Sequence, residues 1–367
     1  MKGKPDEIRP REDDEALVEY YLSESLNGKD STESTKVSYR SSWRAYTNWV
    51  EENGLRLDEI TEEEAREFKN HLLNSKNGWT PENYFRRVKI VIEWLTNTKE
   101  ADYNPFSNVK APETEDDTSK MEVNLEKLRE SVQSALHQNI VLFVYLMIAL
   151  KTGLRSSEIV NLDLRDIHLD HPVSDVMPRP RQEIYNKPDT LYVDSTISEG
   201  EVHNGEKRND GNKDHSTRQI PIDDELKSVL VWWIGMLPPS KSPAGPLLRK
   251  VSSPHGERYS QATMQESVTR WARDNNLNDK SMTHFGVDSH WCRHWFSTTM
   301  RARIDTDEVV VGTPKGYVQG LRGDSDDSTI ETYTHEWSEV VESGKTYRKV
   351  YEDNIPQLLV DTEDRQQ

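Results

Sequence analysis

The feature of this sequence that most constrains its fold is an uninterrupted apolar segment, IVLFVYLMIAL, at residues 140–150. It is shorter than the roughly 20 residues that a helix needs to cross a bilayer. A helix that is apolar on all sides must instead be enclosed by other elements. The segment therefore predicts a buried helix. Its end is predicted at Gly153, because glycine readily adopts the left-handed conformation of a helix cap.

Four amphipathic segments precede this helix. Apolar residues recur at three- and four-residue spacing in DDEALVEYYLSESL, STKVSYRSSWRAYTNWVEENG, TEEEAREFKNHLLNS and TPENYFRRVKIVIEWLTN, and most segments open on a capping Ser, Thr or Asp. They predict a helical domain at 15–110, after a charged tail at 1–14. Residues 111–121, APETEDDTSKM, carry Pro and acidic residues without periodicity, so we expect a linker there.

The rest of the chain predicts a second, mixed domain at 122–357, with a tail at 358–367. The fold class is thus mainly α with a small β-sheet (α+β). Helices are expected at 125–137 and 140–151, short strands at about 190–195 and 217–222, and mostly helix thereafter. Between the strands, STISEGEVHNGEKRNDGNKDHS predicts a long, flexible hairpin loop, and HPVSDVMPRPRQEIYNKPD before them a second irregular insertion.

The charge balance weighs against a nucleic-acid partner. The chain has 47 Lys and Arg against 65 Asp and Glu, a net charge of -18, whereas binding to phosphates favours a basic surface. A local basic groove can nevertheless lie on an acidic protein, and an acidic surface is also a solubility device of salt-loving organisms. We therefore hypothesise a halophilic origin.

Cysteine content and the first residues indicate where the protein acts. The single cysteine, Cys292, excludes an intramolecular disulfide and a cysteine-based zinc cluster, and it fits a reducing compartment. MKGKPDEIRPREDDE lacks the apolar core of a signal peptide. We expect a cytoplasmic protein with no membrane partner, no metal and no cofactor.

The first domain carries cations among aromatic and small polar side chains, as a DNA-facing surface requires. An ordinary solvated helix face is the alternative for each of them. The set is Tyr39, Arg40, Arg44, Lys76, Thr80, Asn83, Tyr84, Arg86, Arg87 and Lys89.

A turn after the apolar helix carries the first candidate site residue, Arg155 in KTGLRSSEI. We expect Ser156 to cap the next helix, which would hold Arg155 in a tight turn where its guanidinium can bind a phosphate through two hydrogen bonds. The alternative is a structural arginine paired with Glu158 or Asp166.

Two motifs follow further along. In SHWCRH, Asp288 or Ser289 is expected to cap a helix that carries His290 and Arg293 on one face, with His294 one turn on. In STIETYTH, a capping box starts a short helix with Tyr333.

Together these residues form a set able to cut DNA. A tyrosine hydroxyl can attack a phosphodiester if fixed cations neutralise the transition state, and two arginines with a histidine supply them without a metal or nucleotide. The ordered boxes TGLRSSEI, HWCRH and ETYTH resemble those of the tyrosine recombinase (phage integrase) family, in the sub-group of halophilic archaea, over residues 15–356.

The resemblance implies a fold and roles. The first domain would be a SAM-like core-binding domain, and the second the catalytic domain. Tyr333 would form a 3'-phosphotyrosyl bond, Arg155 and Arg293 would bind the non-bridging oxygens, and His290 would assist proton transfer. The lysine that protonates the leaving oxygen falls on Lys213.

Two of the implied assignments are open. Because the loop around Lys213 is expanded, Lys207 or Arg208 is an alternative proton donor. Nine residues before Tyr333 the family has a His or Trp donor, whereas this chain has Asp324, and an ionised carboxylate accepts hydrogen bonds but cannot donate them. Asp324 would have to be protonated or bonded to another catalytic group, or Arg322 would take its place.

The implied function is site-specific recombination on double-stranded DNA through a Holliday junction, with a monomer or dimer in solution and a homo-tetramer on the synapsed DNA. Near the C-terminus, IPQLLV is expected to pack on a neighbouring subunit or on its own domain. The alternatives are relaxation of DNA as by a type IB topoisomerase, and a non-catalytic DNA-binding regulator that keeps a decayed recombinase fold.

Overall fold

The chain folds into two compact units, residues 1–119 and 120–367. The computed structural model describes residues 14–26, 33–76, 80–113, 121–212, 217–252, 256–278, 286–301, 315–323 and 346–359. Within these ranges, no helix has the length and apolar character needed to cross a membrane.

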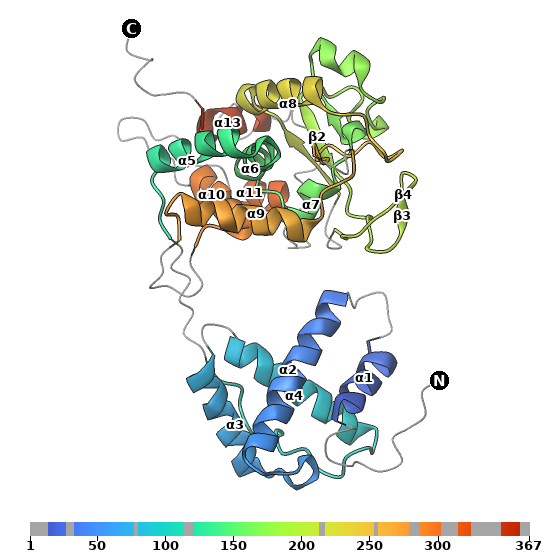
Figure 1. Cartoon of the computed structure of the whole chain (residues 1–367), viewed down its shortest axis with the longest axis vertical. Helices are drawn as coiled ribbons and strands as arrows, with labels where there is room; N and C mark the ends of the chain where they lie inside the picture. The colour runs from blue at the N-terminus through green and yellow to red at the C-terminus, as the bar shows by residue number, and fades with distance from the viewer. Residues whose placement is uncertain are drawn as a thin grey trace. The chain divides into compact units, whose positions relative to one another are not determined.

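The first unit is helical, as predicted (Figure 1). Its helices are α1 (Asp14–Glu24), α2 (Glu33–Glu52), α3 (Glu62–Ser75) and α4 (Thr80–Asn97), with a short 3-10 turn η1 (Leu57–Glu59). Aromatic rings fill the core: Phe68 is fully buried and lies 5.0 Å from Tyr46 and 6.4 Å from Phe106, centroid to centroid. Burial of such large rings stabilises the unit.

The second unit is mainly α with a small β component, so the predicted fold class is confirmed. The apolar segment forms α6 (Ile140–Thr152), which is buried from Val141 onward. Its neighbours include α5, α8, α9 and α10. The helices other than α6 are α5 (Leu125–Gln138), α7 (Ser156–Asn161), α8 (Asp224–Met236), α9 (Gln261–Asp274), α10 (Ser289–Arg301), α11 (Lys315–Arg322) and α13 (Tyr347–Asn354), with 3-10 turns η2 (Leu164–Asp166), η3 (Pro172–Val176) and η4 (Gln182–Ile184).

A three-stranded antiparallel sheet lies beside these helices. The predicted strands are β2 (Thr190–Val193) and β5 (Arg218–Pro221), which pair with Leu191 opposite Ile220. A third strand, β1 (Ile167–His168), pairs with the other edge of β2. It is too short to give a period-two pattern, and the sequence analysis missed it.

The prediction of a long, flexible loop between β2 and β5 is wrong for residues 196–212, the part of this segment that the structure describes. They contain a hairpin of β3 (Val202–His203) and β4 (Glu206–Lys207), joined by Asn204 and Gly205 with φ of 53° and 78°. Asn-Gly is the favoured pair for such a turn because both positions need positive φ. Arg208 then buries its side chain against Asp163, so the insertion is fixed to the domain.

The C-terminal segment packs on its own unit. The Lys151 ammonium, on α6, contacts the carboxylates of Asp223 at 2.7 Å and Glu225 at 2.6 Å, and donates to the Pro356 carbonyl at 2.9 Å. Glu225 in turn accepts from the backbone amide of Leu358 at 2.9 Å. Leu358 is fully buried, so the predicted tail starting at 358 begins too early, and residues 355–359, the described part of IPQLLV, pack on their own domain.

Candidate active site

Arg155 is fixed by the tight turn between α6 and α7. Gly153 ends α6 with φ 64°, and a Cβ there would lie 2.4 Å from the Phe296 ring, so the position requires glycine. Arg155 is the N-cap of α7, and its backbone amide donates to the Glu158 carboxylate at 2.8 Å. The expected cap, Ser156, is therefore wrong. Ser156 is instead the first residue of α7.

The Arg155 side chain is about one-fifth exposed, and among the described residues it contacts a carboxylate and two carbonyls. Its Nη1 lies 3.3 Å from Glu158 Oε1, 3.4 Å from the Arg322 carbonyl and 3.5 Å from the Gly323 carbonyl. The suggested pairing with Glu158 is thus present, whereas Asp166 pairs with Arg181. The contacts to the carbonyls are long for hydrogen bonds.

Arg293 lies deeper, on α10. Asp288 caps this helix, since its carboxylate accepts from the Trp291 amide at 2.6 Å. The Arg293 side chain is buried and donates to the carbonyls of Gly153 and Arg322, both at 2.7 Å. His290 is exposed one turn earlier. The helix therefore carries an accessible imidazole beside a buried guanidinium.

The two arginines converge on one point. Both donate to the carbonyl oxygen of Arg322, at the end of α11. The C-terminal carbonyls of a helix carry partial negative charge, so they offset the repulsion between the guanidinium groups. Two cations that are held this way can bind an anion that displaces a carbonyl.

A third arginine, missed by the sequence analysis, braces this centre. Arg218, at the start of β5, donates to both Glu158 oxygens at 3.0 and 2.8 Å, and through Nε to the Leu321 carbonyl at 2.7 Å. Gly323 follows α11 with φ 64°, and a Cβ there would meet Arg218 at 2.6 Å. The only sequence signal for this role is an arginine at the head of a predicted strand.

Glu158 remains ionised at this position. Burial alone would raise the pKa of its carboxyl group, but the charge and hydrogen bonds of Arg218, with a smaller effect from Arg155, lower that pKa to about 2. A buried carboxylate therefore orients Arg218 and the Arg155 backbone together.

Three predicted site residues, Lys213, Asp324 and Tyr333, lie outside the described residues. The described residues on either side of Lys213 are held by hydrogen bonds. Asn161 on α7 donates to Asn212 Oδ1 at 3.0 Å, and Asn212 donates to the Asp194 carbonyl at 2.7 Å. On the other side of Lys213, the Thr217 hydroxyl lies 2.9 Å from that of Ser195.

The two alternative proton donors differ in exposure. The side chain of Arg208 is completely buried, and its Nη2 lies 2.7 Å from Asp163 Oδ2. An ion pair held in this way does not suit a mobile proton donor. Lys207 is exposed on the hairpin, so its position is compatible with that role.

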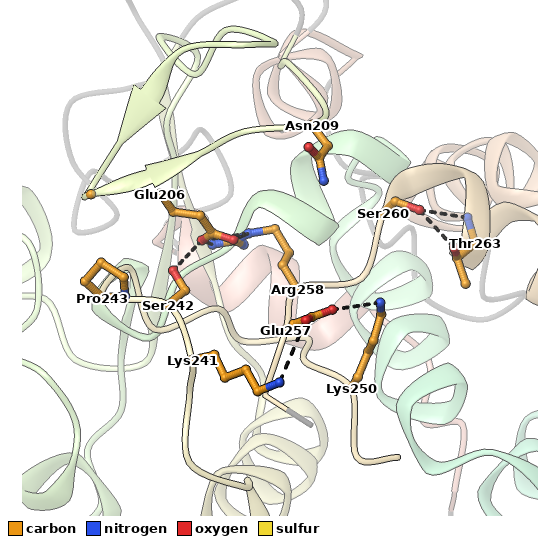
Figure 2. Close-up of a pocket in the computed structure, with 11 residues that line it drawn as sticks. Glu206, Asn209, Lys241, Ser242, Pro243, Lys250, Glu257, Arg258, Ser260 and Thr263 are labelled. Carbon is orange, nitrogen blue, oxygen red and sulfur yellow. Dashed lines mark hydrogen bonds and ion pairs between the residues drawn. The ribbon is translucent and has the colours of Figure 1, made fainter. Parts of the chain in front are cut away.

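A pocket of about 570 Å³ lies beside the same hairpin. Figure 2 shows Glu206 at its edge, joined to Ser242 and Arg258. Arg258 also donates to the Val160 carbonyl of α7 at 2.8 Å. Because these charged groups satisfy one another, we interpret the network as an attachment of the hairpin to α7.

Several cations predicted to face DNA in the first unit are paired with carboxylates. Arg40 contacts Glu19 at 2.6 Å and Glu33 at 2.7 Å, and Arg86 contacts Glu82 at 2.6 Å. These pairs lower the positive charge that this set presents to a partner.

The comparisons with known proteins agree with this fold. The sequence model of the phage integrase family matches residues 122–339. A lambda integrase dimer bound to a COC' core site is similar, with a TM-score of 0.58, 14% identity, and coverage of 89% of this chain and 79% of that chain. The Tn1549 transposon integrase, in a complex with circular intermediate DNA, has a TM-score of 0.57, 16% identity, and coverage of 90% and 96%. The search of curated proteins gave no match.

At these identities, similarity to the solved structures shows only the fold. The family match covers more than half of the chain, and it therefore shows which family the chain belongs to. The family match, together with the fold, defines a protein of the integrase class. The chain belongs to the phage integrase family, the tyrosine recombinases.

Proposed function

We propose that this protein is a site-specific DNA recombinase that cuts and rejoins double-stranded DNA through Tyr333. The observation that carries the proposal is the convergence of Arg155 and Arg293 on the Arg322 carbonyl, with the exposed His290 one turn away from Arg293. A phosphate oxygen would replace the long contacts of Arg155 to the α11 carbonyls at small cost.

In the proposed reaction the Tyr333 hydroxyl attacks phosphorus. A bond forms between the tyrosine oxygen and phosphorus, and the bond to the 5' oxygen breaks, which leaves a 3'-phosphotyrosyl link. His290 assists the transfer of the tyrosine proton, and Lys213 protonates the leaving 5' oxygen. A 5' hydroxyl of a second strand then reverses these steps, so the phosphodiester energy is kept and neither ATP nor a metal is required.

The proposed assembly is a homo-tetramer on two synapsed DNA sites. It is supported by the solved lambda integrase tetramer bound to a Holliday junction, which has a TM-score of 0.57 to this chain at 14% identity, with coverage of 89% of this chain and 79% of that chain. We propose that the reaction takes place in the cytoplasm, in line with the single cysteine.

A covalent-adduct assay tests the proposal. The full chain is incubated at several salt concentrations with nicked DNA that carries the sequence flanking its own gene, then quenched with detergent. We expect protein linked to a 3' end. Tyr333→Phe should abolish the adduct, and Arg293→Ala should lower its rate by about 10²–10³. Tyr185→Phe, at a half-exposed tyrosine outside the site, is the matched control and should leave the adduct unchanged.

Other outcomes would overturn the proposal in different ways. Specific binding to this DNA without an adduct at any salt concentration would favour a non-catalytic regulator. An adduct that relaxes supercoils but never joins two sites would favour a topoisomerase.

A further inference from the structure

Two histidines form a close pair on the exposed side of α10. The Nε2 atoms of His290 and His294 are 3.0 Å apart, and the ring centroids are 4.6 Å apart with the planes at 83°. His290 is exposed and His294 is half-buried. Residues four apart on a helix are neighbours, and here the two rings share an N–H···N hydrogen bond, whose proton a metal ion would have to replace.

This distance fits two ligands of one metal ion. Metal–imidazole bonds are about 2.0–2.1 Å long, so nitrogens 3.0 Å apart enclose an angle of about 90–100° at the metal. That angle is the one between adjacent ligands in square-planar and octahedral sites, which Cu²⁺ and Ni²⁺ adopt. A tetrahedral zinc site would require the two nitrogens to separate by roughly 0.3–0.4 Å.

We propose that His290 and His294 form a two-point clamp for a divalent transition-metal ion, best suited to Cu²⁺ or Ni²⁺, and that the bound ion inhibits DNA cleavage. The inhibition of cleavage by the ion rests on the proposed function, because His290 assists proton transfer in the proposed reaction. An imidazole nitrogen that is bonded to a metal can neither accept nor deliver a proton.

The clamp differs in kind from a structural metal site. Among the residues that the structure describes, no group of three or more His, Cys, Asp or Glu side chains is placed to hold a metal. A pair of imidazoles holds a metal ion less firmly than the three or four protein ligands of a structural site. Inhibition by such an ion is reversible by a chelator.

Direct binding tests the clamp without any DNA. Untagged, chelator-treated full-length protein is titrated with Ni²⁺ by calorimetry and with Cu²⁺ by visible absorption. Losing one ligand of a chelating pair removes the advantage of the second attachment, so His290→Ala and His294→Ala should each weaken the tightest binding by on the order of tenfold or more. His137→Ala, at an exposed histidine on α5, is the matched control. Equal binding by the wild type and the two pair variants would overturn the clamp.

The inhibitory half is tested in the adduct assay. Each variant is normalised to its own rate in chelator, and circular dichroism checks its fold. Ni²⁺ should inhibit the wild type, excess EDTA should restore it, and His294→Gln should need at least about tenfold more Ni²⁺. Equal inhibition of His294→Gln would overturn this half. If the wild type forms no adduct in metal-free buffer, the proposed function fails, whereas the binding arm still decides on the clamp.

Discussion

Charged side chains are used in opposite ways in the two units. In the first unit, the ion pairs of the described residues lie at the surface: the Arg44 and Glu15 side chains are 67% and 77% exposed. In the second unit, the Arg218 and Glu158 side chains are each 2% exposed, and those of Arg208 and Asp163 are completely buried. The first unit relies on packed rings for its core, and the second combines an apolar core with buried charge.

The difference follows from what each unit has to hold in place. Buried ion pairs carry a large desolvation cost and are weak evidence of stability in themselves. In the second unit, however, they join segments that are far apart in the chain: Arg218 connects β5 to α7, and Lys151 connects α6 to α8 and the C-terminal segment. We infer that these pairs fix the backbone positions around Arg155 and Arg293.

The largest expected effect comes from breaking one of these pairs. Arg218→Met leaves the buried Glu158 carboxylate without its main partner, so the free energy of unfolding should fall by about 3–5 kcal/mol. Denaturant unfolding of the full chain measures the loss, and hydrogen exchange should locate it in the second unit.

The matched control is Arg86→Met, because the Arg86 side chain is 63% exposed in its pair with Glu82. We expect a change of less than about 1 kcal/mol for such a surface pair. If the two variants were equally stable, the contrast between the units would be lost.

The second effect depends on pH. Because the pKa of the Glu158 carboxyl group falls to about 2 on folding, its contribution to stability is fully present above the unfolded pKa of about 4.3 and is lost as the pH falls toward 2. The lost stability should amount to about 2–3 kcal/mol. The free energy of unfolding of the wild type and of Glu158→Gln is measured as the pH is lowered. The difference between the slopes of the two curves against pH gives the contribution of Glu158.

Glu64 supplies the comparison in the first unit. Hydrogen bonds from Thr61 also lower the pKa of its carboxyl group, but the side chain is only partly buried. Glu64→Gln should therefore retain nearly the wild-type slope. A wild-type slope in Glu158→Gln would contradict the interpretation of Glu158.

The smallest of these effects concerns the ring-packed core of the first unit. Phe68 is fully buried among Tyr46, Trp49, Phe85 and Phe106. Phe68→Leu loses ring contacts and leaves a small cavity, which should lower the free energy of unfolding by about 1–2 kcal/mol. Leu73→Ala, at a half-exposed position on the same helix, should change it by less than about 0.5 kcal/mol. If both variants lost the same free energy of unfolding, packing of the aromatic rings would not be what stabilises this core.

The sequence predicted the elements whose signals are local. Apolar periodicity is visible within a single segment, so the helices of the first unit, the buried α6 and its Gly153 cap are confirmed. The two-residue strands β1, β3 and β4 are too short to show a pattern. The Asn204–Gly205 pair, in contrast, is a recognisable turn signal in the sequence.

The sequence could not predict how the site is braced. Arg218 and Glu158 are 60 positions apart, and no local pattern indicates that a strand residue will pair with a helix residue across that distance. Ser156 is a suitable cap by residue type, but the cap position falls one residue earlier, on Arg155. Arg155, His290 and Arg293 were proposed from residue type and order, and their roles stay predictions, as do those of Lys213, Asp324 and Tyr333.

The cluster around Lys151 also bears on how the protein is made. A nascent chain emerges from the ribosome with its N-terminus first. The helix α6 is therefore synthesised about two hundred residues before its partners Tyr351 and Pro356. Until then, the Lys151 carbonyl and ammonium lack two of their final bonds. The contacts that anchor the C-terminal end of α6 can therefore form only after Tyr351 and Pro356 have emerged from the ribosome.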